Sequence, residues 1–450
     1  MNKDIVCIGA GYIGGPTMAV IALKNPGRKV WVVDINAERI AAWNSGNLPV
    51  YEPGLDEIVK KVRGKNLFFS TDIEGCIRKC DIVFVGVNTP TKTFGRGAGR
   101  ASDLQFWESS ARTISAAANR DKIVVEKSTL PVRTAEAMEK VLKTHPEHKF
   151  TVLSNPEFLA EGTAIRDLLE PDRVLIGGPR TPEGDKAVKA LAAIYGTWVP
   201  KEKIVTTNLW SAELTKLAAN AMLAQRVSSV NALSALCEAT GADITEVARV
   251  IGLDSRIGPK FLKAGPGFGG SCFKKDVLNL VYLCETYGLK EAADYWNQVI
   301  AMNEWQQERI VTRLLSETFQ TVANKRVAVF GYSFKADTGD IRETPSRHVV
   351  GMLVEEHAKV VVTDPKALPN AERDLASMPK GSVELDPCPY SAAKGADAIV
   401  VMTDWKEYTR LDWRKIRRLM RSPAIVYDTR NCLDRAKLEK LGFKVLAVGR

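Results

Sequence analysis

The sequence predicts an α/β protein with two doubly wound parallel sheets and a central helical region between them. Short apolar runs alternate with helical stretches twice along the chain, as in sheets whose parallel strands are connected by helices. Between the two series lies a long stretch that is rich in Ala and Leu and free of Gly and Pro. Because 450 residues are too many for one hydrophobic core, we expect three domains, at residues 1–207, 208–322 and 323–450.

The first domain is expected to begin with a buried strand at Asp4 or Ile5, followed by a helix from about Gly14 to Leu23. Apolar runs bounded by polar or turn residues predict its further strands. These runs are residues 29–34, 81–87, 122–128, 150–157 and 172–178.

The central domain is expected to contain one long, mostly buried helix over residues 208–240, followed by helices over 275–287 and 292–319. A second strand series predicts the last domain, as a loose duplication of the first. Its runs are residues 325–333, 358–365, 396–405 and 424–430. The stretch between Lys366 and Tyr390 is rich in Pro and charge, and we expect it to leave the sheet as an excursion.

The composition is ordinary for a soluble globular protein, with 45% hydrophobic and 26% charged residues. No apolar run approaches the ~20 residues of a membrane span, and the first strand leaves no room for a signal or transit peptide. The eight cysteines are scattered without a C-x-x-C pair, which favours free thiols and a cytoplasmic enzyme. The four histidines lack zinc-ligand spacing, so no metal site is expected.

The formal net charge of +10 admits nucleic-acid binding as one interpretation. The chain nevertheless has no block of like charges and no basic–aromatic repeat. The charge is better explained by a solvated surface and by basic residues around small anionic ligands. We therefore expect neither a nucleic acid nor a membrane as partner.

A glycine motif directly after the first strand predicts a Rossmann-like dinucleotide site. In Gly9-Ala10-Gly11-Tyr12-Ile13-Gly14 the three glycines permit a tight turn, approach of the pyrophosphate and close packing of the helix. Asp34 ends the next strand, where a carboxylate accepts ribose hydroxyls and repels a 2′-phosphate. The expected cofactor is therefore NAD, although Arg39 is nearby. An ordinary glycine turn is the alternative.

Two further loops follow strands of the same sheet, Val87-Asn88-Thr89-Pro90-Thr91 and Ser128-Thr129-Leu130-Pro131. Ligands of open α/β sheets bind at the carboxyl ends of strands, and both loops offer backbone amides and hydroxyls there. Each loop taken alone is better explained as a simple turn.

Cys272 follows a run of glycines and precedes a helical apolar pattern, in Gly269-Gly270-Ser271-Cys272-Phe273-Lys274-Lys275-Asp276. A helix N-terminus and neighbouring lysines both stabilise a thiolate, which is the form that a nucleophilic cysteine requires. A buried structural cysteine is the alternative, and it suits the other seven cysteines better.

Two pairs of polar residues are four positions apart. Lys216 and Asn220 share one face of the long helix. A lysine between apolar residues there either acts on a ligand or, as the local sequence alone favours, reaches the surface or forms a salt bridge. Glu157 and Glu161 follow a strand end, where they are either general bases or acids at a helix start.

Long motifs spread over the chain give it a family resemblance: GAGYIGGPT, YEPGLDEIV, VNTPTKT, EKSTLPVRTAE, LSNPEFLAEGTA, PDRVLIGG, GFGGSCFKKD and FKADTGDIRETP. The chain resembles the UDP-glucose 6-dehydrogenase branch of the UDP-glucose/GDP-mannose dehydrogenase family, and most closely its animal and plant form. The resemblance implies an N-terminal NAD-binding domain, a C-terminal domain for the UDP-sugar, and two successive oxidations of C6. It also implies a homodimer at least, with a hexamer as the alternative.

The resemblance assigns roles to individual residues. Cys272 forms a thiohemiacetal and then a thioester, Lys216 and Asn220 stabilise oxyanions, Asp276 and Thr129 hold water for proton transfer, and Glu157 assists hydrolysis. The cofactor is assigned to Gly9, Gly11, Tyr12, Ile13, Gly14, Asp34, Arg39, Val87, Asn88, Thr89, Pro90, Thr91, Ser128, Thr129, Glu161, Cys272, Lys275 and Arg342. The substrate is assigned to Glu157, Phe158, Leu159, Ala160, Glu161, Lys216, Asn220, Arg256 (reaching a neighbouring subunit), Phe261, Lys263, Ala264, Gly265, Pro266, Gly267, Phe268, Gly269, Phe334, Lys335 and Arg430.

The chain departs from the animal and plant pattern at Pro266, at Ala336 and in a shorter segment between Lys366 and Tyr390. Three alternatives stay open at this stage. One is a related dehydrogenase of GDP-mannose or a UDP-N-acetylhexosamine, and another is a two-electron hydroxyacid dehydrogenase that needs no cysteine. The third is a non-catalytic protein that binds NAD or nucleic acid.

Overall fold

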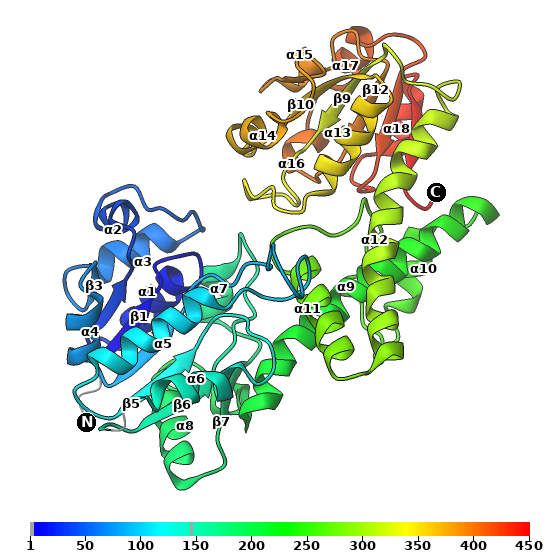
Figure 1. Ribbon diagram of the computed structural model, residues 1–450. Coiled ribbons are helices and arrows are strands. Elements are labelled where there is room, and N and C mark those ends of the chain that lie inside the picture. Colours follow the sequence, from blue (N-terminus) through cyan, green and yellow to red (C-terminus); the bar gives the residue numbers. More distant parts are fainter. Residues whose placement is uncertain (1–3, 145–146) are drawn as a thin grey trace. The chain divides into compact units, whose positions relative to one another are not determined.

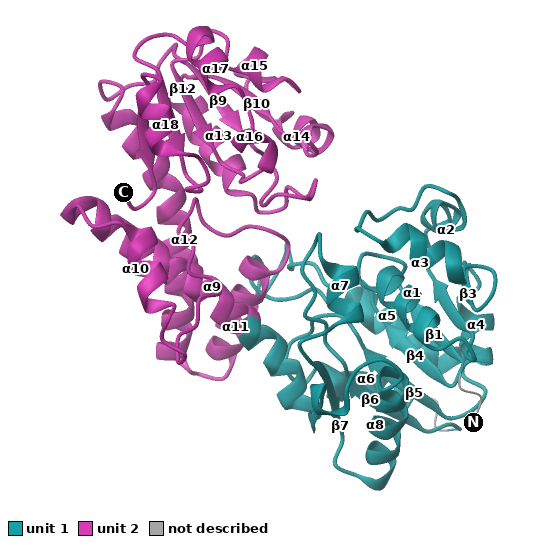
Figure 2. Cartoon of the chain, turned by 180° about the vertical axis from the view of Figure 1, so that it is seen from behind, with its two compact units in different colours: residues 1–219 teal, residues 220–450 magenta. Residues whose placement is uncertain are grey.

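The computed structural model describes residues 4–144 and 147–450 (Figure 1). The chain divides into two compact units, residues 1–219 and 220–450, which Figure 2 shows in different colours. Helix α9 (Leu209–Thr240) is continuous across the division. No helix within the described ranges is both long and apolar enough to cross a bilayer.

An eight-stranded sheet forms the centre of the first unit, as far as its described residues show, in the order β3-β2-β1-β4-β5-β6-β7-β8. The strands are β1 (Ile5–Ile8), β2 (Val30–Val33), β3 (Leu67–Ser70), β4 (Ile82–Val85), β5 (Lys122–Glu126), β6 (Phe150–Ser154), β7 (Val174–Gly178) and β8 (Ile204–Asn208). The helices before α9 are α1 (Gly14–Lys24), α2 (Ala37–Asn44), α3 (Leu55–Val62), α4 (Ile73–Lys79), α5 (Gln105–Ala117), α6 (Thr134–Leu142), α7 (Ala164–Leu169) and α8 (Pro182–Tyr195), with the 3₁₀ turn η1 (Lys201–Lys203).

Helices cover both faces of this sheet because alternate residues of each strand point to opposite faces. Ile5 and Cys7 of β1 pack in the core under α1, α2, α3, α7 and α8. Val6 and Ile8 of the same strand pack in the core under α4, α5 and α6. The strands therefore read as continuous apolar runs, as expected for a doubly wound sheet.

The second unit, all of whose residues are described, has a six-stranded parallel sheet in the order β11-β10-β9-β12-β13-β14. The strands are β9 (Arg326–Phe330), β10 (Lys359–Thr363), β11 (Val383–Leu385), β12 (Ala398–Val401), β13 (Ile425–Asp428) and β14 (Lys444–Ala447). The helices after α9 are α10 (Ile244–Ile251), α11 (Phe273–Thr286), α12 (Lys290–Ser316), α13 (Pro345–Glu355), α14 (Leu368–Leu375), α15 (Pro389–Ala392), α16 (Lys406–Thr409), α17 (Trp413–Leu419) and α18 (Arg435–Lys440).

One face of the second sheet is covered by α13 and α14 together with the long helices, because Val230 of α9 and Ile310 of α12 share its core. The other face is covered by α15, α16, α17 and α18. Helix α11 packs with α9 and α12 in a separate apolar cluster that includes Phe268 and Val277. This helical cluster and the sheet core flank the loop of residues 264–272.

The predicted fold class is confirmed, and four details differ. Strand β7 meets β6 antiparallel through Ser154 and Gly177, so the first sheet is not wholly parallel. Strands β3, β8 and β14 were not expected, and each lies at an edge of its sheet, where only one neighbouring strand pairs with it. The segment between Lys366 and Tyr390 is not an excursion, because it folds into α14 and the edge strand β11, which pairs with β10. Finally, the long helix α9 is not buried along its whole length, since Leu236 is 60% exposed.

Two buried carboxyl groups lie near the end of β5: those of Glu126 in the strand and Glu213 in α9. Glu126 is 1% exposed, and no hydrogen bond from a described residue reaches either of its carboxyl oxygens. Glu213 of α9 accepts hydrogen bonds from the backbone N–H groups of Arg133 (2.7 Å) and Ala135 (2.9 Å), at the start of α6. Burial and the nearby charge of Glu213 raise the pKa of Glu126 well above its usual range.

We predict that Glu126→Gln changes the pH dependence of folding. A carboxyl group with a raised pKa stabilises the folded state while protonated, and this contribution is lost as the pH rises from about 4.3 through the folded pKa. The difference in the free energy of unfolding, variant minus wild type, measured with urea, should therefore increase as the pH is raised above about 4.3. Glu170→Gln, at an exposed position, is the control. A constant difference between variant and wild type would contradict the prediction.

Candidate active site

The three glycines after β1, Gly9, Gly11 and Gly14, have different steric surroundings. Gly9 has φ +106°, and a Cβ there would lie 2.5 Å from the carbonyl oxygen of Gly86. A Cβ on Gly14 would lie 1.9 Å from the carbonyl oxygen of Gly9, so α1 can start here only with glycine. A Cβ on Gly11 would meet no described atom within 4 Å, which leaves open space beside the helix N-terminus. This arrangement fits a pyrophosphate at the start of α1.

Asp34 holds the same loop from the end of β2. Its Oδ2 accepts hydrogen bonds from the backbone N–H of Ala10 (2.9 Å) and from Nη1 of Arg39 (3.1 Å), and its Oδ1 accepts from the N–H of Asn36 (2.9 Å). Trp43 donates from Nε1 to the carbonyl of Ala10 (2.9 Å). Because Arg39 is paired with Asp34, its charge does not stand alone as a receptor for a 2′-phosphate. The residues present fit the adenosine ribose of NAD.

The two expected loops at the ends of β4 and β5 lie together. Thr89 donates from its hydroxyl to the carbonyl of Thr129 (3.1 Å), and Ser128 donates from its hydroxyl to the carbonyl of Val87 (2.6 Å). Next to them, Lys127 is buried and donates from Nζ to Oδ1 of Asn155 (3.1 Å). Burial lowers the pKa of Lys127 to about 8, and the sequence alone did not single out this lysine.

Glu157 and Lys216 form a buried ion pair in the first unit. Nζ of Lys216 lies 3.3 Å from Oε1 of Glu157, and both side chains are about 5% exposed. Oε2 of Glu157 also accepts a hydrogen bond from the N–H of Leu159 (2.7 Å). Glu157 lies in the loop between β6 and α7, so it is not an acid of a helix start. A buried, paired carboxylate and ammonium at a strand end suit proton transfer and the stabilisation of anions.

Glu52 is a residue of this region that sequence reasoning missed. Its carboxylate is 5% exposed and accepts hydrogen bonds from the N–H groups of Gly162 (2.7 Å) and Ala164 (3.1 Å) and from the hydroxyl of Tyr12. Burial, with the Glu52 carboxylate next in importance, raises the pKa of the Tyr12 hydroxyl. Glu52 therefore connects the glycine loop to the loop that carries Glu157 and Glu161. The YEPG motif contains this glutamate, but its hydrogen-bond partners lie far away in sequence, so the motif alone did not reveal its role.

Cys272 is the N-cap residue of α11 in the second unit, and it is exposed, as its expected reactivity requires. The hydroxyl of Ser271 lies 3.5 Å from its Sγ. The neighbouring lysines are themselves paired: Lys274 lies 3.3 Å from carboxylates of both Glu304 and Glu343, and Lys275 lies 3.7 Å from Asp276. The position at the N-terminus of α11 agrees with the expectation from the sequence.

Asp276 and Asn220 form a second buried polar pair. Nδ2 of Asn220 donates to Oδ2 of Asp276 over 2.6 Å, and Asp276 is 1% exposed. Asp276 lies one turn along α11 from Cys272, whose carbonyl accepts its backbone N–H (2.8 Å). The structure thus brings two of the expected catalytic side chains into contact and a third onto the same helix turn.

The glycine-rich loop before Cys272 meets two other expected substrate residues. A Cβ on Gly265 would lie 3.7 Å from the side chain of Arg430, and a Cβ on Gly269 would lie 2.9 Å from Cβ of Phe334. Arg430 donates from Nη2 to the carbonyl of Phe334 (2.8 Å). Nζ of Lys335 lies 5.4 Å above the ring of Phe334. These residues, far apart in the sequence, form one surface of the second unit.

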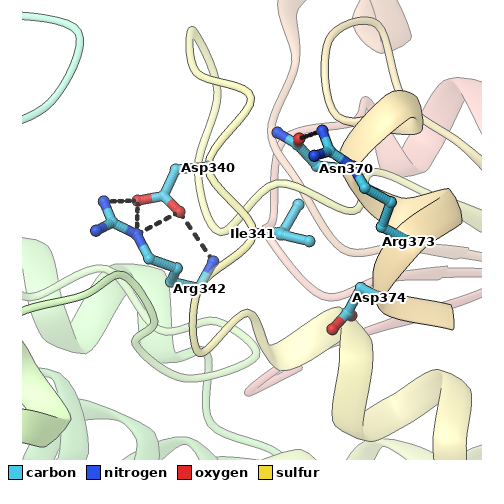
Figure 3. Close-up of a pocket in the computed structure, with 6 residues that line it drawn as sticks. All are labelled: Asp340, Ile341, Arg342, Asn370, Arg373 and Asp374. Atoms are coloured by element: carbon cyan, nitrogen blue, oxygen red, sulfur yellow. Dashed lines mark hydrogen bonds and ion pairs between the residues drawn. The ribbon is translucent and has the colours of Figure 1, made fainter. Parts of the chain in front are cut away.

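Two expected arginines are each paired with an aspartate nearby in sequence. The carbonyl of Arg342 accepts the N–H of Gly270 (2.8 Å) in the glycine-rich loop, and its guanidinium is bound to Asp340 (2.6 Å). Arg342 and Asp340 line an open pocket with Ile341, Asn370, Arg373 and Asp374 (Figure 3). Arg256 is exposed and is bound to Asp254 (2.7 Å). Within the residues that the structure describes, no cluster of His, Cys, Asp and Glu is suited to a metal ion.

Models of one family match all three expected regions. The NAD-binding domain of the UDP-glucose/GDP-mannose dehydrogenase family matches residues 3–199, its central domain matches 210–305, and its UDP-binding domain matches 328–435. The chain belongs to this family. It is therefore an NAD-dependent dehydrogenase, and the glycine loop, Asp34 and the two loops after β4 and β5 lie in its NAD-binding domain.

Individual relatives are similar over almost the full chain. UDP-glucose 6-dehydrogenase 2 of Oryza sativa subsp. japonica is 57% identical, and UDP-glucose 6-dehydrogenase 2 of Arabidopsis thaliana is 58% identical. Each match covers 99% of this chain and 97% of the relative. A solved structure of a UDP-glucose dehydrogenase from the hyperthermophilic archaeon Pyrobaculum islandicum has a TM-score of 0.87 at 30% identity, and the match covers 100% of this chain and 98% of that one.

We predict that Asp34→Asn reduces the preference of the dehydrogenase for NAD over NADP. The amide removes the negative charge that repels a 2′-phosphate and leaves Arg39 without its counter-charge. The ratio of kcat/KM for the two cofactors should fall at least about tenfold, equivalent to about 1.4 kcal/mol. Glu38→Gln removes one exposed charge nearby and should leave the ratio unchanged. An unchanged ratio in Asp34→Asn would exclude the carboxylate as the determinant.

Proposed function

We propose that the protein oxidises C6 of UDP-glucose twice, from primary alcohol to carboxylate, with UDP-glucuronate as product. The observation that carries this proposal is the exposed Cys272 thiol at the N-terminus of α11, one turn before the buried Asp276–Asn220 pair. A single oxidation of an alcohol needs no nucleophile, whereas a second oxidation of the aldehyde does. The similarity to two plant UDP-glucose 6-dehydrogenases supports the choice of substrate.

The first oxidation needs a proton acceptor and a stabilised alkoxide. Both oxidations transfer a hydride from C6 to NAD. The Lys216 ammonium stabilises the alkoxide that forms when the hydroxyl proton leaves to a water held by Asp276 and Thr129. The pairing of Lys216 with Glu157 supports this role, because it holds the ammonium group at a buried position beside the carboxylate.

The second oxidation proceeds on the cysteine. The Cys272 thiolate adds to the aldehyde carbon, and the carbonyl oxygen becomes an oxyanion that Lys216 and Asn220 stabilise. Loss of a hydride from this thiohemiacetal to a second NAD gives a thioester. Water then adds with Glu157 as base, the C–S bond breaks, the thiolate leaves and the carboxylate remains.

Lys216 and Asn220 lie one turn apart on the continuous helix α9, where Lys216 pairs with Glu157 and Asn220 donates to Asp276. For the substrate we propose the loop from Phe261 to Gly269 with Phe334, Lys335 and Arg430, and Arg256 of a neighbouring subunit. For the cofactor we propose all the binding residues that the family resemblance assigned to it in the sequence analysis.

We also propose the division into domains at 1–207, 208–322 and 323–450, a homodimer at least, and a cytoplasmic location. Exposed apolar side chains support the dimer: Leu236 of α9 is 60% exposed, Val250 of α10 is 55% exposed and the nearby Leu253 is 76% exposed. Apolar side chains gathered on neighbouring helices are typical of a surface that another chain covers. A cytoplasmic location agrees with eight cysteines that form no disulfide.

The stoichiometry of NADH tests the proposed function. We predict that purified protein forms two NADH for each UDP-glucose consumed, with UDP-glucuronate identified by mass spectrometry. A ratio of one with release of aldehyde would overturn the double oxidation. Turnover of GDP-mannose or a UDP-N-acetylhexosamine in place of UDP-glucose would keep the chemistry and change the substrate.

Replacement of the thiol tests the covalent step. Cys272→Ala should reduce turnover to UDP-glucuronate at least about a thousandfold, since the second hydride transfer loses its tetrahedral donor. Cys388→Ala removes a thiol that is equally exposed but lies before α15, and should leave activity unchanged. Full activity in Cys272→Ala would show that the aldehyde reacts without the cysteine.

A further inference from the structure

Two residues of the loop before Cys272, Gly265 and Phe268, have both their backbone N–H and their backbone C=O bonded to side-chain amides. The N–H of Gly265 donates to Oδ1 of Asn231 (2.9 Å), and the carbonyl of Gly265 accepts from Nε2 of Gln306 (2.8 Å). At Phe268, the N–H donates to Oδ1 of Asn303 (2.7 Å) and the carbonyl accepts from Nδ2 of the same residue (3.1 Å). Helices α9 and α12 therefore supply, from outside the loop, the bonds that a sheet would supply to a strand.

The side-chain amides of Asn231, Asn303 and Gln306 are buried. Asn231 and Gln306 are completely buried, and Asn303 is 4% exposed. A buried polar group that loses its partner costs about 1–3 kcal/mol, so the loop cannot move without breaking favourable bonds. Gly267 has φ +109°, and a Cβ there would lie 2.7 Å from Oδ1 of Asn303. The glycine thus permits the close approach that Asn303 needs.

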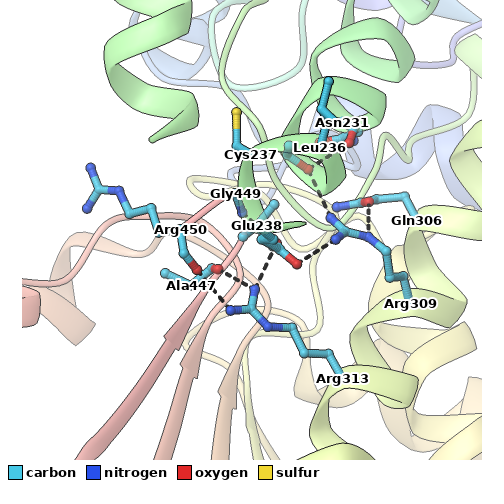
Figure 4. Close-up of polar contacts among 12 residues, drawn as sticks. Asn231, Leu236, Cys237, Glu238, Gln306, Arg309, Arg313, Ala447, Gly449 and Arg450 are labelled. Atoms are coloured by element: carbon cyan, nitrogen blue, oxygen red, sulfur yellow. Dashed lines mark hydrogen bonds and ion pairs between the residues drawn. The ribbon is translucent and has the colours of Figure 1, made fainter. Parts of the chain in front are cut away.

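A further set of bonds orients Gln306 (Figure 4). Arg309 donates from Nε to Oε1 of Gln306 (3.1 Å), and its Nη1 lies 2.6 Å from Oε2 of Glu238. Glu238 also binds Arg313 (2.8 Å) and accepts from the N–H of Gly449 (2.6 Å). Because Arg309 occupies the amide oxygen of Gln306, the amide nitrogen is left to face Gly265.

We propose that Asn231, Asn303 and Gln306, together the amide clamp, are positioning residues for the nucleotide part of the substrate. The clamp sets the shape of residues 265–268, of which Gly265 lies beside Arg430, the residue proposed to bind the UDP-sugar. This inference rests on the proposed function. Loss of the clamp would displace the loop relative to Arg430 and weaken binding of the uridine diphosphate, while the NAD site of the first unit would stay unchanged.

The test is Asn303→Leu, which has a similar size and removes both bonds to Phe268. The KM for UDP-glucose and the Kd for UDP, measured by calorimetry, should rise at least about tenfold, while the KM for NAD changes less than about twofold. Gln298→Leu, at an exposed position of the same helix, should change neither constant. A folded Asn303→Leu protein with a UDP Kd within about twofold of the wild type would overturn the clamp.

A conservative variant separates positioning from loss of stability. In Asn303→Asp the ionised carboxylate accepts from the N–H of Phe268 but cannot donate to its carbonyl, whereas the protonated form can. The UDP Kd of this variant relative to wild type should therefore fall as the pH is lowered, and Asn303→Leu should show no such trend. A pH-independent ratio would overturn the proposal, even where Asn303→Leu does not fold.

The two proposals fail in different ways. Wild-type protein that binds UDP but does not oxidise UDP-glucose would refute the proposed function and leave the clamp to be decided by the UDP Kd of the variants. Wild-type protein that oxidises UDP-glucose, with variants whose constants are unchanged, would refute the clamp alone.

Discussion

Helix α9 carries Lys216 and Asn220 one turn apart, and each contacts a buried carboxylate. Lys216 pairs with Glu157, and Asn220 donates to Asp276. Removing one partner of such a pair leaves a buried charge that costs about 3–5 kcal/mol, so the geometry around each carboxylate is strongly constrained. The Glu157 carboxylate holds its own loop through the N–H of Leu159, and Asp276 belongs to the turn of α11 that starts at Cys272. The loop after β6 and the first turn of α11 therefore both depend on one face of one helix.

Buried polar side chains that hold backbone loops recur in both units. In the first unit, Asp34 at the end of β2 accepts the N–H of Ala10 in the loop after β1. In the second unit, Asp364 after β10 accepts the N–H groups of Tyr332 and Ser333 in the loop after β9. Asp364 additionally accepts from Nε1 of Trp405 and is 3% exposed. Asp34 can therefore still accept a ribose hydroxyl, whereas Asp364 is occupied by hydrogen bonds within its own domain. This difference agrees with the match of the first region to an NAD-binding domain and of the last to a UDP-binding domain.

The Cys272 thiol is only a small part of the proposed site. Cys272 owes its exposure to the glycines before it and its electrostatic setting to the helix after it. The amide clamp and Glu52 contribute no group to the chemistry, yet they fix loops on which the proposed substrate and cofactor residues lie. Loops held in this way would suit the covalent intermediate proposed for Cys272, because its formation and release need reacting groups at fixed positions.

Features that depend on neighbouring residues could be predicted from the amino-acid sequence. The glycine motif, Asp34, the start of α1, the long helix α9 and the position of Cys272 at a helix start were all predictable, because turns, caps and apolar periodicity are local. The family resemblance added residue roles that no local pattern contains. Other features emerged only from the packing of the folded chain: the antiparallel contact of β6 with β7, the place of β11 in the sheet, the bonds of Glu52 and the amide clamp. Those features join residues tens of positions apart, and the physical rule that selects them, satisfaction of buried polar groups, acts only after the chain has been packed.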